Sequence, residues 1–338
     1  MAIECAGVSL KAWAVMTGYF RHCARNLVAV VAGLLGLTLG AQAQQSENTC
    51  SLASVMRMPL DVSGAWFTTT AAINGHPVVM LIDTGAAHSA ISPELAKQLR
   101  LPEDRHTKIV IHGVGGDMKA AHPVIAHSFR AGHGDLVDYE MVVANVGGAG
   151  RKGQPGVPQG VIGIDLLSYY ELEFDFPGRT LTLYESSNCS GNFAPWTGHF
   201  DTIKGKRQLD GQLFIPVRLN KEAINAVVDT GSSYTTLGID TAHDIGISDA
   251  ELRSDHPDGA FGASGVLVPG HRHYFDSFEV GETVFHRAPL SIQDEHFGVM
   301  QMLLGMDFLR PRKVWLSFKT EQVFLQYAAG LNEQRPPP

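Results

Sequence analysis

One short motif occurs twice in this chain, each time directly after an apolar run. The triplet Asp-Thr-Gly stands at 83–85, after the run at 78–82, and again at 229–231, after the run at 226–228. The second triplet lies 146 residues (229 − 83) after the first. A repeat of this length is too long for a solenoid. It therefore indicates that one small lobe has been duplicated, so that two related halves can face each other across a pseudo-twofold axis.

The segments before the two triplets repeat as well. Asn74-Gly75 is a strong hairpin-turn signal between two apolar runs. The offset of the triplets maps this turn onto Asn220-Lys221. The predicted strands of the two hairpins are 66–73, 77–82, 213–219 and 223–228.

Further elements follow each triplet in the same order. Ser92-Pro93 predicts the start of a helix that ends near Leu99, because serine caps a helix and proline suits its first position. An apolar pair followed by glycine occurs at 161–163 and again at 303–305. Each half is expected to close with a hairpin, and the four strands of these hairpins are 170–176, 180–184, 313–318 and 322–327.

The composition supports an all-β protein. The chain of 338 residues contains 36 glycines and 17 prolines, and short runs of Val, Ile, Leu and Thr are frequent, a pattern typical of strands and turns. A hydrophobic content of 44% is enough for two lobes with apolar cores. Charged residues make up only 18%, the net charge is −8, and no basic tract stands out. A nucleic-acid partner is therefore not expected.

The N-terminal segment predicts a secretory signal. Arg21 and Arg25 precede an apolar run at 27–39, and small residues at 41–43 suit a cleavage site. The run is shorter than the roughly 20 residues that a membrane-spanning helix needs. We expect an exported protein, periplasmic or secreted, with no stable membrane insertion after signal cleavage. An uncleaved membrane anchor is the alternative.

Signal cleavage would leave two of the four cysteines, Cys50 and Cys189, in the mature chain. A disulfide between them is plausible in an oxidising compartment. Two separate free thiols are the alternative, because spacing alone does not show that the sulfur atoms approach.

These features divide the chain into six segments and place the active cleft between the two lobes, where ligand sites commonly form. The segments are a signal peptide at 1–43, an N-terminal arm at 44–63, an N-terminal lobe at 64–186, an inter-lobe linker at 187–210, a C-terminal lobe at 211–328 and a flexible tail at 329–338.

Each lobe also carries a glycine-rich tip between its triplet and its apolar-glycine element. Glycines suit a mobile hairpin tip whose backbone comes close to a ligand, so we expect two flaps. A surface turn without function is the alternative for each tip. The flap residues are Gly113, Val114, Gly115 and Gly116 in the first lobe and Gly262, Ala263, Ser264 and Gly265 in the second.

The duplicated aspartates predict acid–base chemistry. Two carboxyl groups about 3 Å apart do not ionise together easily, so one holds a proton while the other acts as a base. Hydrolysis of an amide by water needs both functions. We therefore expect Asp83 and Asp229 to form a catalytic pair, with threonine hydroxyls bonding into the opposite lobe and glycines leaving space beside the carboxylates. The residues that support the catalytic loops in this way are Thr84, Gly85, Thr230 and Gly231.

The two halves resemble the aspartic proteases. The resemblance rests on 81–86 and 227–233 as active-site loops and on the apolar-glycine elements, and it covers most of 64–328. Ala86 and the Gly-Val-Gly-Gly tip are similar to retropepsin-like bacterial members rather than to pepsins. The resemblance implies two acid-protease β-barrel lobes with the active cleft between them. It also implies an endopeptidase that binds an extended polypeptide through backbone hydrogen bonds, and one chain carrying both halves should suffice as a monomer.

The same resemblance implies that residues just past the triplets contact substrate: Ala87 and His88 in one lobe, Ser233 and Tyr234 in the other. No cofactor is expected, and the 15 histidines show no metal-ligand spacing, so no metal site is predicted. Two other functions remain open, a catalytically silent peptide-binding protein of the same fold and an interaction scaffold of the cell envelope. Retention of all six triplet residues argues against silent binding, because binding alone needs none of them.

Overall fold

The computed structural model of the chain describes residues 49–63, 66–110, 122–146, 157–262 and 266–327. The predicted signal peptide and C-terminal tail lie outside these ranges. Strands make up most of the described chain, as the sequence predicts, and its five helices are short. Among the described residues, none of the helices is long and apolar enough to span a membrane.

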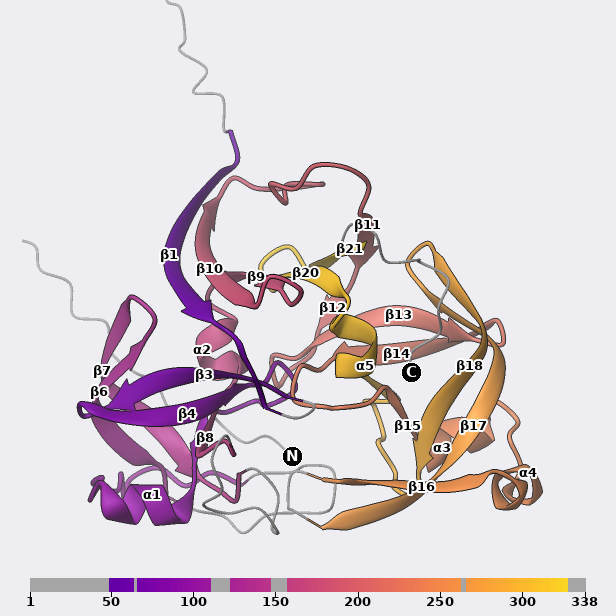
Figure 1. The fold of residues 1–338 in the computed structure, drawn as a ribbon, viewed down its shortest axis with the longest axis horizontal. Coiled ribbons are helices and arrows are strands. Elements are labelled where there is room, and N and C mark those ends of the chain that lie inside the picture. Colours follow the sequence, from indigo (N-terminus) through magenta and orange to yellow (C-terminus); the bar gives the residue numbers. More distant parts are fainter. Residues whose placement is uncertain (1–48, 64–65, 111–121, 147–156, 263–265, 328–338) are drawn as a thin grey trace, which may run out of the picture. The chain divides into compact units, whose positions relative to one another are not determined.

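The N-terminal lobe is a closed six-stranded barrel (Figure 1). Its strands follow the order β3, β4, β8, β5, β7 and β6, and β6 pairs back onto β3. The short strand β2 extends the sheet beside β3. The bounds are β2 (Asp61–Ser63), β3 (Trp66–Ile73), β4 (His76–Ile82), β5 (Ala90–Ile91), β6 (Val124–Ala131), β7 (Gly134–Val143) and β8 (Gly160–Ile162).

The C-terminal lobe repeats this barrel strand for strand. Its order is β13, β14, β19, β15, β18 and β17, and β17 pairs back onto β13. β12 and β16 extend the sheet at its ends. The prediction of two related β-barrel lobes is therefore confirmed. The bounds are β12 (Lys206–Arg207), β13 (Leu213–Leu219), β14 (Glu222–Val228), β15 (Thr236–Gly238), β16 (His256–Phe261), β17 (Leu267–Val280), β18 (Thr283–Gln293) and β19 (Met302–Leu304).

The repeated asparagines have the same local role in both lobes. Asn74 and Asn220 adopt positive φ angles of 50° and 48° in their hairpin turns, a conformation that asparagine tolerates better than most residues. The side-chain oxygen of Asn74 accepts from the backbone N–H of Ser128 at 2.9 Å, and that of Asn220 accepts from Ser277 at 3.1 Å. Each turn is thereby tied to the strand that closes its barrel.

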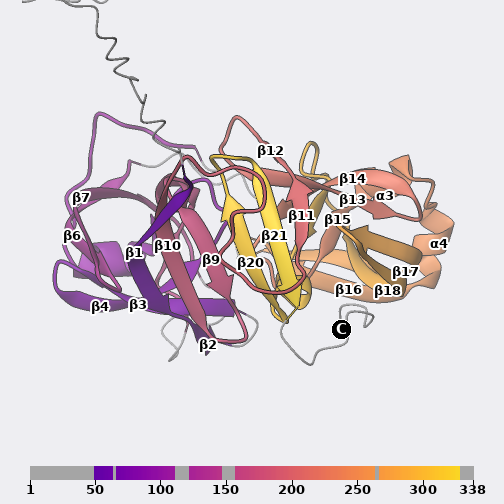
Figure 2. The same cartoon turned by 90° about the horizontal axis from the view of Figure 1, so that it is seen from above.

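A third sheet, shared by both halves, joins the barrels (Figure 2). Its order is β1, β10, β9, β20, β21 and β11, so the closing hairpins of the two halves pair with each other through β9 and β20. The segment expected to be an N-terminal arm contributes β1, and the expected linker contributes β11. The bounds are β1 (Ser51–Pro59), β9 (Glu171–Asp175), β10 (Thr180–Ser187), β11 (Asp201–Lys204), β20 (Arg312–Ser317) and β21 (Gln322–Tyr327).

The strands of the arm and the linker both bury alternate residues. Met56 and Met58 are buried on alternate positions of β1, and Ile203 is buried on β11. Two-residue alternation places one face of a strand on the core. The sequence predicts an arm and a linker here, with no strand in either segment.

The helices lie at the ends of strands. The expected helix start is confirmed, since Ser92 accepts from the backbone N–H of Leu95 at 3.2 Å. The helix α4 was not expected, although Ser248 and Glu251 form a capping box at its start. The bounds are α1 (Pro93–Gln98), α2 (Ile164–Leu167), α3 (Ile239–Asp244), α4 (Asp249–Ser254) and α5 (Met306–Leu309).

One apolar cluster extends from both barrels into the shared sheet. At the join, the buried Trp315 of β20 donates from its indole N–H to Glu171 of β9 at 3.0 Å. A disulfide links Cys50, just before β1, to Cys189, just after β10, with an S–S distance of 2.04 Å. The sequence left this pairing open. The structure places both cysteines at the edge of the shared sheet.

Candidate active site

Both Asp-Thr-Gly triplets begin where a barrel strand ends. β4 ends at Ile82 and lies parallel to β8, and the backbone N–H of Asp83 donates to the Ile162 carbonyl at 3.0 Å. β14 and β19 repeat this arrangement, with the N–H of Asp229 donating to Leu304 at 3.0 Å. The apolar run fixes each strand in its barrel, so the triplet that follows leaves the barrel at a defined point.

The two threonines lock the loops to each other. Each backbone N–H donates to the other threonine's hydroxyl oxygen, Thr84 to Thr230 and Thr230 to Thr84, both at 3.1 Å. The Thr84 hydroxyl donates to the Val228 carbonyl at 2.5 Å, and the Thr230 hydroxyl donates to the Ile82 carbonyl at 2.8 Å. Both side chains are buried, with 2% and 1% exposed. The hydroxyls thus bond into the opposite lobe in both directions.

Backbone N–H groups orient the carboxylate of each triplet. One oxygen of Asp83 accepts from Gly85 at 2.9 Å and from Ala86 at 3.0 Å. One oxygen of Asp229 accepts from Gly231 at 2.8 Å and from the next residue at 3.1 Å. In each aspartate, Oδ1 accepts hydrogen bonds from the backbone of its own loop. The second carboxylate oxygen, Oδ2, therefore remains to interact with a neighbouring group.

The two aspartates interact directly through a side-chain hydrogen bond. Asp229 is 8% exposed and Asp83 is half-buried. Burial raises the pKa of Asp83 well above its usual range, and the negative charge of Asp229 raises it further. Burial also raises the pKa of Asp229, while its backbone donors and the hydrogen bond from Asp83 lower it. The pair therefore shares one proton, and the two groups titrate together.

The triplet glycines lie against the opposite aspartate. A Cβ atom at Gly85 would lie 2.5 Å from Cγ of Asp229, and one at Gly231 would overlap Asp83 in the same way. No real side chain tolerates such distances, so any residue other than glycine would displace a catalytic carboxylate. The sequence predicts that these glycines leave space beside the carboxylates. In the structure, the aspartate of the opposite lobe fills that space.

A second ring of polar residues, missed by the sequence analysis, supports the N-terminal loop. Asp165, at the start of α2, accepts from the backbone N–H and the hydroxyl of Ser89 at 2.9 and 2.7 Å. The Ser89 hydroxyl oxygen in turn accepts from the N–H of Gly163 at 2.9 Å, and Ala86 accepts from Ile164 at 2.9 Å. The catalytic loop is thus fastened to the apolar-glycine element behind it.

The C-terminal loop has the same support. Asp307, at the start of α5, accepts from the N–H and the hydroxyl of Thr235 at 2.8 and 2.7 Å. The Thr235 hydroxyl oxygen accepts from Gly305 at 3.2 Å. Burial raises the pKa of Asp307, although its hydrogen bonds and the charge of Arg272 lower it. The signal was present in the sequence, since an aspartate stands two residues after both apolar-glycine elements.

Gln212 also contacts the N-terminal Asp-Thr-Gly loop, and no sequence pattern predicted this contact. Its side chain is 5% exposed, and its amide nitrogen donates to the carbonyl of Gly85. By the offset of the lobes its counterpart is Trp66. The C-terminal half thus contributes a side-chain contact to the N-terminal Asp-Thr-Gly loop.

The residues expected to contact substrate follow the catalytic loops. His88 and Tyr234 are exposed, whereas Ala87 and Ser233 are partly buried. The first flap tip, at 113–116, lies outside the described residues. In the second flap, Gly262 is described at the end of the β16–β17 hairpin, and the remaining three tip residues are not.

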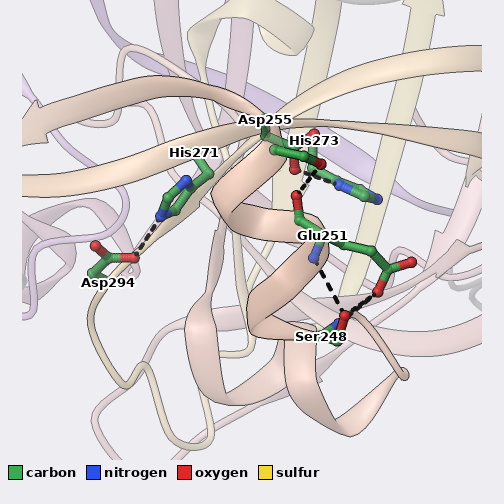
Figure 3. A network of polar contacts seen from close by, with 7 residues as sticks. Ser248, Glu251, Asp255, His271, His273 and Asp294 are labelled. Atoms are coloured by element: carbon green, nitrogen blue, oxygen red, sulfur yellow. Dashed lines mark hydrogen bonds and ion pairs between the residues drawn. The ribbon is translucent and has the colours of Figure 1, made fainter.

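His271 and His273 lie on β17, and each pairs with a carboxylate from another part of the lobe (Figure 3). His273 Nδ1 lies 2.8 Å from Asp255, the residue that ends α4, and His271 Nε2 lies 3.5 Å from Asp294 after β18. These pairs connect the end of the β16–β17 hairpin that lies away from its tip to the end of α4 and to the residue after β18. Neither pair includes a third ligand.

Comparison with known families agrees with the geometry. A family model described as aspartyl protease matches residues 69–166 and matches again at 215–308. Each matched segment contains one triplet and one apolar-glycine element. A search among curated proteins gave no match.

Proposed function

The chain belongs to the aspartyl protease family, and from this premise we propose that it is an aspartic endopeptidase whose catalytic pair is Asp83 and Asp229. The observation that carries the proposal is that the two aspartates, one from each lobe, face each other, since each lies against the triplet glycine of the opposite loop, and that the pKa of both is raised. A carboxyl pair that holds one proton is suited to acid–base catalysis.

The proposed reaction divides the two roles between the pair. The ionised carboxylate removes a proton from a water molecule, whose oxygen bonds to the carbonyl carbon of the peptide. The protonated carboxyl supplies a proton to the amide nitrogen as the C–N bond breaks. Water has then been split between the new carboxyl and amine ends, and the pair has regained its single proton. Because the two carboxyl groups titrate together, the roles of base and acid belong to the pair.

We further propose that the substrate is an extended polypeptide and that a monomer is sufficient, since both aspartates come from one chain. The protein would act outside the cytoplasm. The N-terminal segment supports export, and the Cys50–Cys189 disulfide is compatible with an oxidising compartment.

Cleavage of a peptide library tests the proposal. The mature chain, Asp83→Asn and Asp229→Asn are incubated with the library across pH, with and without an aspartyl-protease inhibitor, and products are identified by mass spectrometry. Each single substitution is expected to lower the cleavage rate by about 10²–10⁴-fold, because it removes the acid–base function. The inhibitor is expected to block the wild-type protein.

The control is an unchanged fold in both variants, measured by circular dichroism and thermal unfolding. Wild-type cleavage rates in either variant would refute the catalytic pair. Absence of cleavage by the wild-type protein, together with retained binding of library peptides, would favour a silent peptide-binding protein of the same fold.

A further inference from the structure

A cavity of about 500 Å³ lies at the side of the C-terminal barrel, next to the shared sheet. It is bordered by β11, the β17–β18 turn, β20 and β21. None of the residues that line it belongs to either catalytic loop. The cavity is therefore separate from the proposed hydrolytic site.

Three metal-ligating side chains meet at this cavity: His199, Asp201 and Glu282. The imidazole Nε2 lies 3.6 Å from Oδ1 of Asp201 and 3.2 Å from a carboxylate oxygen of Glu282. One ligand atom from each residue lies within 4.8 Å of the other two. In a tetrahedral zinc site, metal–ligand distances of about 2.0–2.2 Å place neighbouring ligand atoms roughly 3.3–3.6 Å apart. The two separations from His199 Nε2, 3.6 Å to Asp201 and 3.2 Å to Glu282, are close to this range.

The carboxylate at the centre of the group is held in place. Asp201 is 8% exposed, and its Oδ2 accepts from the backbone N–H of Glu282 at 3.1 Å. Metal-binding carboxylates are commonly oriented by such hydrogen bonds. The carbonyl of His199 accepts from Gln326 on β21 at 3.2 Å, which fixes the backbone that carries the imidazole. The side chains of His199 and Glu282 are 68% and 74% exposed, so a hydrated ion can reach them.

We propose that His199, Asp201 and Glu282 bind a zinc-type divalent cation and that this cation clamps the shared sheet to the β17–β18 hairpin. A set with one imidazole and two carboxylates suits Zn²⁺, whereas Ca²⁺ and Mg²⁺ prefer oxygen ligands alone. Water completes the coordination, and the ion stabilises the folded state because its ligands come from segments distant in sequence. Sequence spacing cannot indicate this site, since His199 and Glu282 are brought together only by the fold.

Zinc binding to the full chain tests the proposal independently of peptidase activity. The chelator-treated protein is titrated with zinc chloride by calorimetry at pH 7.5, and thermal unfolding is recorded with and without zinc. One equivalent is expected to bind and to raise Tm. His199→Ala and Glu282→Gln are each expected to weaken binding by about 10–100-fold and to abolish the Tm shift. Glu282→Gln keeps the backbone N–H that holds Asp201, so folding is preserved.

His243→Ala is the matched control, because His243 forms an exposed pair with Asp249 at 2.9 Å and has no third ligand. This variant is expected to bind zinc as the wild-type protein does. Equal zinc affinity in wild-type, His199→Ala and Glu282→Gln proteins would overturn the proposal. Calcium binding as tight as zinc binding, and unaffected by loss of the imidazole, would overturn it as well.

Discussion

In the N-terminal barrel, Tyr139 on β7 lies opposite Ala126 on β6; in the C-terminal barrel, the matching positions are Ala288 on β18 and Phe275 on β17. The large and small residues have exchanged strands. The Tyr139 hydroxyl donates to Ser89 behind the catalytic loop at 2.5 Å, whereas Phe275 is fully buried and has no hydroxyl.

This exchange shows which features of the duplicated lobe are constrained. Core volume is conserved between the barrels although the aromatic residue comes from different strands, as expected where packing tolerates volume-conserving changes. The triplets, the hydrogen bonds to Oδ1 and the Thr84–Thr230 contacts are the same in both lobes. The lobes therefore agree at the triplets and differ at this core pair, where an aromatic residue fills the space in both and only Tyr139 adds a hydrogen bond.

The largest effect is expected where the lobes agree. Thr84→Val leaves the Val228 carbonyl and the Thr230 N–H without the partners that the structure shows. Thr230→Val likewise leaves the Ile82 carbonyl and the Thr84 N–H without their partners. Each buried unpaired group costs about 1–3 kcal/mol, so each variant should lose about 2–6 kcal/mol in urea unfolding, along with most of its activity.

The control for this pair is Thr70→Val, at an exposed position on β3, which should change stability by less than about 0.5 kcal/mol. Losses that differ by more than about 2 kcal/mol between Thr84→Val and Thr230→Val would show that the loop contacts are not energetically symmetric, despite their matching geometry.

The sequence predicted the parts of this structure that repeat in recognisable order. The strand bounds of β3 and β13, the Ser92 cap and both triplets follow from local patterns. The shared sheet did not, because pairing of β9 with β20 joins segments that have no common local signal. Gln212 was missed for the same reason, since its bond to Gly85 depends on how the lobes dock. Asp165 and Asp307 could have been found from their equal spacing after the two apolar-glycine elements.

An intermediate effect is expected from the catalytic pair itself, as a pH dependence of stability. Burial raises the pKa of both aspartates, and the negative charge of Asp229 raises that of Asp83 further. A folded-state pKa above the unfolded value of 3.8 means that the native protein binds more protons. The contribution to stability is then complete below pH 3.8 and is lost as the pH rises through the folded pKa.

Asparagine cannot ionise, so Asp83→Asn should avoid this loss. Its free energy of unfolding, measured in urea from pH 4 to pH 8, should rise relative to the wild-type protein as the pH increases. A gain of the same sign is expected for Asp229→Asn, because burial raises the pKa of Asp229 as well. A curve for Asp83→Asn that runs parallel to the wild-type curve would mean that the carboxyl is not destabilised by burial.

The smallest effect is expected at the residue that distinguishes the lobes. Tyr139→Phe gives the N-terminal barrel an aromatic residue without a hydroxyl, as in the C-terminal barrel, and keeps its volume. Ser89 still donates to Asp165 and still accepts from Gly163, so the loss should be only about 1 kcal/mol. Tyr169→Phe, at a residue that is 80% exposed, is the control and should be neutral.

A loss of about 3 kcal/mol or more in urea unfolding of Tyr139→Phe would show that the hydroxyl is indispensable to this lobe. The C-terminal lobe would then have to replace it by other means, and Arg272, whose charge acts on Asp307, is the residue to substitute next.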